Sequence, residues 1–272
     1  MGLLIVEGEM LSDRGVVSEI NEDTVAFVIP AATEMRAGLG LVAVLADGMG
    51  GQSAGEVASR MAVDSIIRCL PSLALPVPDA LARCMADANG EIRARRAADP
   101  ACAGMGTTCT ILLLRDDALF LGHIGDSRAY LCRSGALQQL SDDHSAVREL
   151  VRNGQLTQAE ARNSPMRNII LRALGLKPNI EPLIWNAGLP LQDGDILVMC
   201  SDGLTDGVDD DAIAATVSRL PPGDACRALI DAAMQAGGHD NISVGVFAVR
   251  GRPIQEQDMD ATRRIDPVNP AG

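Results

Sequence analysis

The stretch Leu41-Val-Ala-Val-Leu-Ala-Asp47-Gly-Met-Gly-Gly51 joins an apolar segment to a carboxylate-bearing turn. The apolar residues 41–46 predict a buried strand, which ends abruptly at Asp47. The strand fixes the carboxylate, and the glycines let backbone groups approach closely, so this turn can hold a cation. Taken alone, Asp-Gly is more typical of an ordinary tight turn. The choice between the two interpretations depends on the rest of the chain.

The composition limits the size and the partners of this protein. Its 272 residues fit one large domain or two small ones, and an apolar fraction of 47% is ample for an aliphatic core. The net charge of −13 would repel nucleic acid and anionic membranes, so neither is an expected partner. Residues 1–10 lack a basic leader, and no apolar run approaches the length of a membrane span.

The cysteine pattern predicts the compartment. The seven cysteines include no C-x-x-C pair, and Cys109 and Cys200 lie inside apolar runs. We therefore expect buried free thiols in a reducing compartment, and a cytoplasmic location.

Strands occur in runs and helices in pairs. The predicted strands are 3–11, 24–29, 41–46, 108–114, 118–124, 129–132, 195–200 and 242–249, and the predicted helices are 53–70, 79–98, 144–153, a short one capped by Thr157, 209–219 and 224–236. Asp79, Asp209 and Asp224 are expected to cap their helices. This order predicts an α+β fold with two antiparallel sheets and helices outside. The polar, Pro/Gly-broken residues 160–182 indicate a mobile insert rather than core.

Aspartates mark several predicted strand ends. Asp47 and Asp202 follow apolar strands and precede glycines, Asp126 follows strand 118–124, and Asp240 precedes the last strand. Carboxylates that converge without lysines repel one another, and a divalent cation cluster would neutralise them. Oxygen-only ligation favours Mg²⁺ or Mn²⁺ over Zn²⁺. The alternative is four unrelated turn aspartates.

Seven motifs follow one another in order. They are Ser12-Asp-Arg-Gly15 with Asn21-Glu-Asp23, Asp47-Gly-Met-Gly-Gly51 with Gly55-Glu56, Gly106-Thr-Thr108, Gly125-Asp-Ser-Arg128, Asp143-His-Ser145, Ser201-Asp-Gly-Leu204 and Gly238-His-Asp-Asn241. In this series the chain resembles the protein phosphatase 2C family, the metal-dependent Ser/Thr protein phosphatases, in their compact bacterial form. The resemblance spans about residues 8–250.

The resemblance implies a four-layer α-β-β-α sandwich with a phosphatase domain in residues 1–250. It implies a flap insert at about 146–182 beside the active site, and a disordered tail at 251–272. Motifs 106–108 and 143–145 are expected to support the site without binding metal.

The resemblance also implies a site with two or three Mn²⁺ or Mg²⁺ ions. By position, the catalytic carboxylates would be Asp47, shared between two metals, with Asp202 and Asp240 completing one of them. The remaining expected metal contacts are the Gly48 carbonyl, Glu22 and Asp23 through bound waters, and Asp126 at a third, weaker position. A hydroxide that bridges the metals would attack phosphorus directly.

One expected residue is missing from the pattern. Ser18 stands where family members usually carry an arginine that grips the substrate phosphate. A charge-assisted contact of that kind is worth about 1.5–3 kcal/mol, so weaker phosphate binding is expected. Arg14 is a candidate substitute, and a plain surface arginine is the alternative interpretation.

The resemblance implies a monomeric phosphoserine/phosphothreonine protein phosphatase that opposes a bacterial Ser/Thr kinase. The alternative is a catalytically weak, phosphatase-like domain that binds phosphoproteins. In the tail, Thr262-Arg-Arg-Ile265 has the spacing that forkhead-associated domains favour when the threonine is phosphorylated, which suggests a docking peptide.

Overall fold

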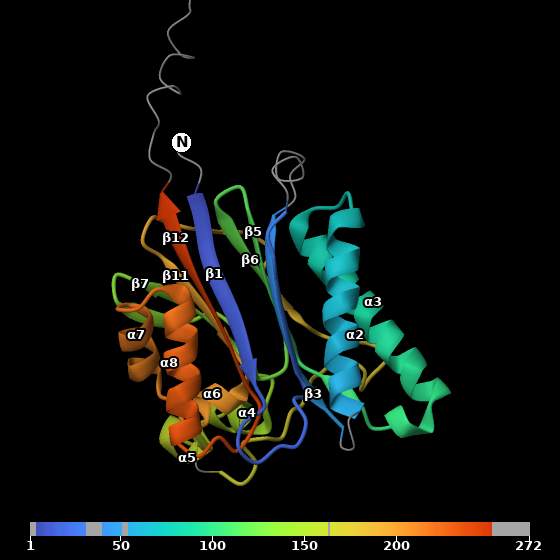
Figure 1. Ribbon diagram of the computed structural model, residues 1–272. Coiled ribbons are helices and arrows are strands. Elements are labelled where there is room, and N and C mark those ends of the chain that lie inside the picture. The colour runs from blue at the N-terminus through green and yellow to red at the C-terminus, as the bar shows by residue number, and fades with distance from the viewer. Residues whose placement is uncertain (1–3, 31–39, 51–53, 163, 252–272) are drawn as a thin grey trace, which may run out of the picture.

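The computed structural model of this chain describes residues 4–30, 40–50, 54–162 and 164–251 (Figure 1). The predicted tail, 251–272, begins at the last residue of the final strand, and its remainder, with the Thr262 motif, lies outside the described residues. In the part that is described, no helix is both long enough and apolar enough to cross a membrane.

Two antiparallel sheets stack face to face at the centre of the molecule (Figure 1). One sheet has the order β1-β12-β11-β7-β8, and the other has the order β10-β6-β5-β3-β2, with β4 paired to β3 and β9 to β6. The strands are β1 (Leu4–Asp13), β2 (Asp23–Val28), β3 (Leu41–Met49), β4 (Gly106–Thr107), β5 (Cys109–Arg115), β6 (Ala118–Ile124), β7 (Arg128–Arg133), β8 (Ala136–Gln139), β9 (Leu183–Ile184), β10 (Leu189–Pro190), β11 (Ile196–Cys200) and β12 (Ile242–Gly251). The short strands β4, β8, β9 and β10 were not among the sequence predictions.

Helix pairs cover the outer face of each sheet (Figure 1). The long helices are α2 (Ala54–Cys69) and α3 (Val77–Ala98) on one side, and α7 (Asp210–Val217) and α8 (Pro222–Gln235) on the other. The shorter ones are α4 (Ala146–Arg152), α5 (Gln158–Arg162), α6 (Asp202–Thr205), η1 (Leu70–Ser72) and η2 (Pro100–Cys102). The predicted α+β fold, a four-layer α-β-β-α sandwich, is confirmed.

Strand β3 is apolar throughout because it contributes to two cores. Val44 faces the core beneath α2 and α3, while its neighbour Leu45 faces the core between the sheets. Side chains alternate between the faces of a strand, so a strand buried on both faces needs a continuous apolar run. The run 41–46 therefore marks the strand that ties the outer helix layer to the centre of the sandwich.

The strand ends that carry the site lie at one end of the sandwich. Asp23 on β2 is the register partner of Asp47 on β3. In the other sheet, Asp13 at the end of β1 pairs with Ile242 at the start of β12. Figure 1 shows the ends of β1 and β3 at the same end of the molecule, near α4 and α6. The antiparallel register thus gathers residues from distant parts of the sequence.

Two of the predicted helix caps are wrong and two are confirmed. Asp209 Oδ1 accepts from the Ala212 N–H at 2.8 Å, and Thr157 Oγ1 accepts from the Glu160 N–H at 3.2 Å. Helices α3 and α8 instead begin two residues before the predicted caps Asp79 and Asp224, because Pro78 and Pro222 already suit the first helical turn. The two aspartates lie within that turn, where they still complement the helix dipole.

The prediction that residues 160–182 stay outside the core is wrong at Leu174. This side chain is fully buried in the core beneath α2 and α3. Its backbone forms a bridge with Thr107, with N···O distances of 3.2 and 2.9 Å. The insert is therefore tied to the strand next to the predicted site.

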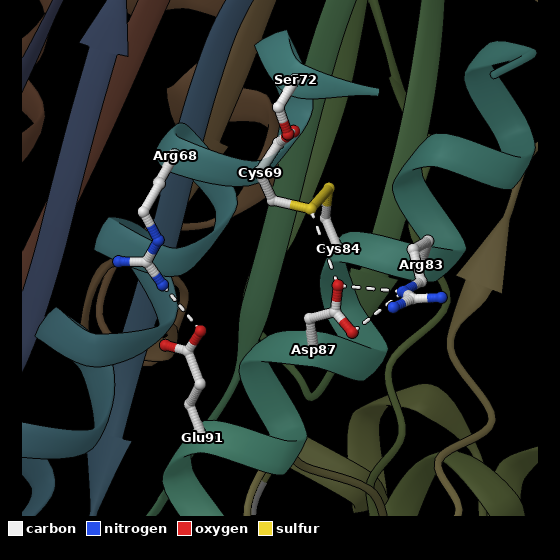
Figure 2. Close-up of a disulfide and its surroundings, with 7 residues drawn as sticks. All are labelled: Arg68, Cys69, Ser72, Arg83, Cys84, Asp87 and Glu91. Atoms are coloured by element: carbon white, nitrogen blue, oxygen red, sulfur yellow. Dashed lines mark hydrogen bonds and ion pairs between the residues drawn. A yellow bond between two sulfur atoms is a disulfide. The ribbon is translucent and has the colours of Figure 1, made fainter. Parts of the chain in front are cut away.

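The prediction of seven free thiols is wrong for one pair. Cys69 at the end of α2 and Cys84 on α3 form a disulfide (Figure 2). The reason is tertiary: the two helices pack side by side and bring Cα atoms that are 15 residues apart to 5.7 Å. The other five cysteines are buried and free, as predicted: Cys102, Cys109, Cys132, Cys200 and Cys226.

Reduction of this disulfide should destabilise the protein. A cross-link that closes a loop of 15 residues stabilises the fold by about 3 kcal/mol in the chain-entropy model. We therefore expect dithiothreitol to lower the free energy of unfolding of the wild type by about that amount, as measured by urea denaturation. The double variant Cys69→Ser/Cys84→Ser should match the reduced wild type and should not respond to dithiothreitol. Equal stability of oxidised and reduced wild type would contradict the expected contribution.

Candidate metal centre

Backbone hydrogen bonds hold Asp47 at the end of β3. Its N–H donates to Thr108 Oγ1 at 2.9 Å, and its carbonyl accepts from the Thr108 N–H and from Thr107 Oγ1, both at 2.9 Å. Thr108 Oγ1 lies 2.8 Å from Ser127 Oγ. Threonines 107 and 108 thus support the carboxylate through its backbone, which is the supporting role expected for their motif.

The turn after Asp47 packs against the Asn-Glu-Asp motif. The Gly48 N–H donates to the Glu22 carbonyl at 3.1 Å, and Glu22 Oε1 accepts from the Gly55 N–H at 3.1 Å. A Cβ atom at Gly48 would lie 2.2 Å from the Gly55 carbonyl oxygen. The glycine is required because three backbone segments meet here with no room for a side chain.

Asp202 and Asp240 come from two loops that touch. Asp202 begins α6 directly after β11, and Asp240 lies just before β12. A Cβ atom at Gly203 would lie 2.1 Å from the Asn241 carbonyl oxygen, so the loops pack backbone against backbone. The two carboxylates are therefore positioned by adjacent strands of the same sheet.

Asp126 follows β6 in a tightly bonded turn. The His144 N–H donates to the Gly125 carbonyl at 2.7 Å, and the Gly125 N–H donates to His144 Nδ1 at 3.2 Å. Next to it, Arg128 pairs with Asp143 at 2.7 Å. The motif at 143–145 thus supports the turn that carries Asp126, as expected.

The predicted carboxylates form one electrostatic cluster. Burial raises the pKa of Asp47 well above its usual range, and four neighbouring carboxylates raise it further: Asp23, Asp202, Asp126 and Asp240. Burial, with the charges of Asp126 and Asp240, likewise raises the pKa of Asp202. These interactions favour a cluster over four unrelated turn aspartates.

The outer members of the cluster shift in the same direction. Burial, with the charge of Asp240, raises the pKa of Asp23 to about 6. Burial, with the charge of Asp143, raises the pKa of Asp126 to about 7. The pKa of Glu22 is also raised, mainly by burial. Every one of these shifts would be reversed by a nearby cation.

Unpartnered oxygens at this cluster fit such a cation. Both carboxylate oxygens of Asp23, and Oδ1 of Asp126 and of Asp202, are buried without a hydrogen-bond partner. Buried charged oxygens without partners are strongly unfavourable unless something neutralises them. Among the described residues, no group of three or more His, Cys, Asp or Glu side chains is arranged to hold a metal ion by protein ligands alone. A Mg²⁺ ion keeps several of its waters, so it does not require such a group.

Asn241 is a functional residue that the sequence analysis named without a role. Its Oδ1 accepts from the Glu22 N–H at 2.7 Å, and its Nδ2 donates to the carbonyls of Arg14 and Ile20 at 2.9 and 3.0 Å. One amide thus fixes loop 14–22 against Asp240. The sequence feature that could have identified this residue is its position between the candidate ligand Asp240 and the predicted strand 242–249.

The candidate phosphate contacts lie in that loop. The Arg14 side chain is exposed and donates to the Glu19 carbonyl at 3.4 Å, while Ser18 is half-buried. Gly15, with φ at 76°, leaves room for the Asp240 carbonyl, which would lie 2.2 Å from a Cβ atom. The loop is therefore held next to the cluster, but its hydrogen bonds leave no guanidinium fixed toward the carboxylates.

A cavity of about 240 Å³ opens beside the cluster. Its lining includes Asp126 and Asp202 together with residues of helices α4 and α5 of the insert. The insert thus forms a wall of the space that adjoins the carboxylates.

Residues 17–223 match the family model described as Protein phosphatase 2C. The chain belongs to the protein phosphatase 2C family. It is 33% identical over 263 residues to the serine/threonine phosphatase stp of Listeria monocytogenes, covering 94% of this chain and 100% of that relative. The family membership agrees with the order of the seven motifs.

Two further comparisons bear on the cluster. The chain is 38% identical over 249 residues to the serine/threonine protein phosphatase PstP of Mycobacterium tuberculosis. The match covers 90% of this chain and 45% of PstP, so this chain spans about half the length of that relative. The structure also resembles the catalytic domain of PstP solved in complex with two manganese ions, with a TM-score of 0.79, 34% identity, and coverage of 91% of this chain and 100% of that one. Metal binding by this phosphatase 2C relative agrees with the unpartnered carboxylate oxygens found here.

Removing one buried charge should stabilise the metal-free protein. The pKa of Asp126 is raised from 3.8 to about 7, so its contribution to stability is fully present below about pH 4 and is lost as the pH rises through about 7. In EDTA at pH 8, Asp126→Asn should unfold with a free energy higher by on the order of a few kcal/mol, and this advantage should vanish near pH 4. Urea denaturation at both pH values measures it.

The exposed residue Asp64 on α2 provides the control. Asp64→Asn should leave the stability unchanged at both pH values. If Asp126→Asn and the wild type were equally stable at pH 8 in EDTA, the electrostatic penalty assigned to this cluster would be wrong.

Proposed function

We propose that this chain is a Mn²⁺- or Mg²⁺-dependent phosphatase that hydrolyses phosphoserine and phosphothreonine in proteins. The observation that carries the proposal is the set of buried, unpartnered carboxylate oxygens of Asp23, Asp126 and Asp202 at one end of the sandwich. The relatives' names, which describe serine/threonine phosphatases, support the substrate class.

The residues divide into ligands and supports. Asp47 would hold both metals, the Gly48 carbonyl would hold one, and Asp202 with Asp240 would hold the other. Glu22 and Asp23 would act through metal-bound waters, and Asp126 would serve a third, weaker position. The raised pKa of Asp47 and the unpartnered oxygens of the cluster support this assignment.

The metals, when bound, supply an activated water and neutralise charge on the phosphoryl oxygens. The chain holds Asp47 in place through Thr108, and it holds loop 14–22 against Asp240 through Asn241. Burial raises the pKa of Cys109 and Cys200 to about 12, so neither of these two thiols is activated as a nucleophile. Direct attack by water, without a covalent intermediate on a thiol, is the chemistry that fits these groups.

The expected partners are phosphorylated proteins and a cognate bacterial Ser/Thr kinase. The five free, buried cysteines support a reducing, cytoplasmic location, whereas the Cys69–Cys84 disulfide counts against it. We keep the monomer and the docking of a phosphorylated Thr262 to a forkhead-associated domain as proposals. Deleting residues 251–272 tests the docking proposal, because a partner interaction that survives the deletion cannot depend on the tail.

Replacing a metal carboxylate should abolish hydrolysis without unfolding the protein. Asp47→Asn and Asp202→Asn should each lower the Mn²⁺-dependent kcat/KM for a phosphopeptide at least about 100-fold, since even indirect support of a metal is commonly worth 10–100-fold. Circular dichroism should remain that of the folded protein. Retained Mn²⁺-dependent hydrolysis in either variant would contradict the assignment of that residue as a metal ligand.

The wild type separates the enzyme from the rival interpretation as a binding-only domain. Mn²⁺-dependent release of p-nitrophenol from p-nitrophenyl phosphate, abolished by EDTA, supports the enzyme. Phosphopeptide binding without any metal-dependent hydrolysis supports the binding domain instead. Comparison of phosphopeptides with sugar phosphates then tests whether the substrates are proteins.

Restoring the missing arginine should strengthen substrate binding. Ser18 lies in the loop that Asn241 holds against Asp240, so an arginine there can reach a phosphate near the cluster. We expect Ser18→Arg to lower KM for a phosphopeptide about ten-fold, as a charge-assisted hydrogen bond is worth about 1.5–3 kcal/mol. An unchanged or raised KM would show that this position is not a phosphate contact.

A further inference from the structure

The cavity beside the carboxylate cluster has a mixed lining. It includes Asp126 and Asp202, and each of these has a buried Oδ1 without a hydrogen-bond partner. Residues of α4 and α5 of the insert line the same cavity. A ligand in this cavity therefore contacts both the carboxylates and the insert.

Four arginines line this cavity, and three of them are already paired. Arg128 pairs with Asp143 at 2.7 Å and Arg148 with Asp142 at 2.7 Å. The third pair joins Arg167 to Asp206 at 3.5 Å. These three guanidinium groups are largely neutralised by the protein itself.

Arg162 at the end of α5 is the fourth. Its side chain lines the cavity and makes no hydrogen bond or ion pair with any residue that the structure describes. An arginine presents a planar set of donors that matches carboxylate and phosphate oxygens. The guanidinium group of Arg162 is therefore available to bind an anionic group in the cavity.

The insert as a whole is positively charged against an acidic background. The chain carries a net charge of −13, yet residues 146–182 hold six basic side chains against three acidic ones. The basic ones are Arg148, Arg152, Arg162, Arg167, Arg172 and Lys177, and the acidic ones are Glu149, Glu160 and Glu181. Asp142 and Asp206, outside the insert, pair with Arg148, Arg152 and Arg167 and offset most of this excess. Among the described residues, the charge that remains available to an anionic ligand in the cavity is that of Arg162.

We propose that Arg162 binds an anionic oxygen group of the phosphorylated substrate within this cavity. The inference rests on the proposed phosphatase function and names the residue that replaces the arginine missing at Ser18. The anionic group is either the phosphoryl group itself or a carboxylate next to the phosphorylated residue. Both present oxygens that a guanidinium binds through two parallel hydrogen bonds.

The test compares Arg162→Ala and Arg162→Lys with the wild type. Arg93→Ala is the matched control, because Arg93 is exposed on α3 and its side chain has no hydrogen-bond or ion-pair partner among the described residues. KM and kcat are measured with p-nitrophenyl phosphate and with two phosphopeptides that differ only in acidic or neutral flanking residues. The Kd of a fluorescent, non-hydrolysable phosphonate analogue of the acidic peptide is measured as well.

Arg162→Ala should raise KM and the phosphonate Kd about ten-fold, with a smaller effect on kcat, and Arg162→Lys should recover part of the loss. A rise in KM for all three substrates assigns Arg162 to the phosphoryl group. A rise confined to the acidic peptide assigns it to the flanking carboxylate. Equal KM and Kd for Arg162→Ala and Arg93→Ala would overturn the proposal while leaving the phosphatase function intact. Absence of hydrolysis by the wild type would refute the function instead.

Discussion

Burial of several carboxylates at one end of the sandwich is the constraint on which this structure depends. Burial raises the pKa of all four of Asp23, Asp47, Asp126 and Asp202, and the charges of Asp23 and Asp126 raise the pKa of both Asp47 and Asp202 further. Asp23, Asp126 and Asp202 also have buried oxygens without partners. Uncompensated, such charges oppose folding. A bound divalent cation reverses the penalty, so the same arrangement that destabilises the empty site gives the bound metal its affinity.

The fold holds this cluster together through the backbone. Strand β3 is anchored by burial on both faces, and Thr108 fixes the backbone of Asp47 where the strand ends. From the other sheet, Asn241 fixes loop 14–22. Because these contacts join backbone to buried side chain, the carboxylates are placed by rigid elements rather than by their own flexible torsions, as a pre-organised site requires.

Local patterns predicted what depends on nearest neighbours. The apolar run 41–46 and the aspartates at strand ends predicted the strands and the carboxylate cluster, because side-chain alternation and strand termination are local properties. The prediction that Asp79 and Asp224 cap their helices was wrong, because a proline in the first turn lets each helix begin two residues earlier. The prediction that residues 160–182 lie outside the core was wrong at Leu174, because a polar segment can still bury one side chain in a core formed by distant elements.

By itself the sequence determined the fold class, the order of the motifs and the aspartates at the strand ends, since each is encoded in residues that are adjacent or regularly spaced. Only the tertiary structure decided the Cys69–Cys84 disulfide, the role of Asn241 and the lack of a partner for the Arg162 side chain among the described residues. Glu22 and Asn241 are 219 positions apart, yet they share a hydrogen bond of 2.7 Å. Such contacts depend on how layers stack, which no local periodicity encodes.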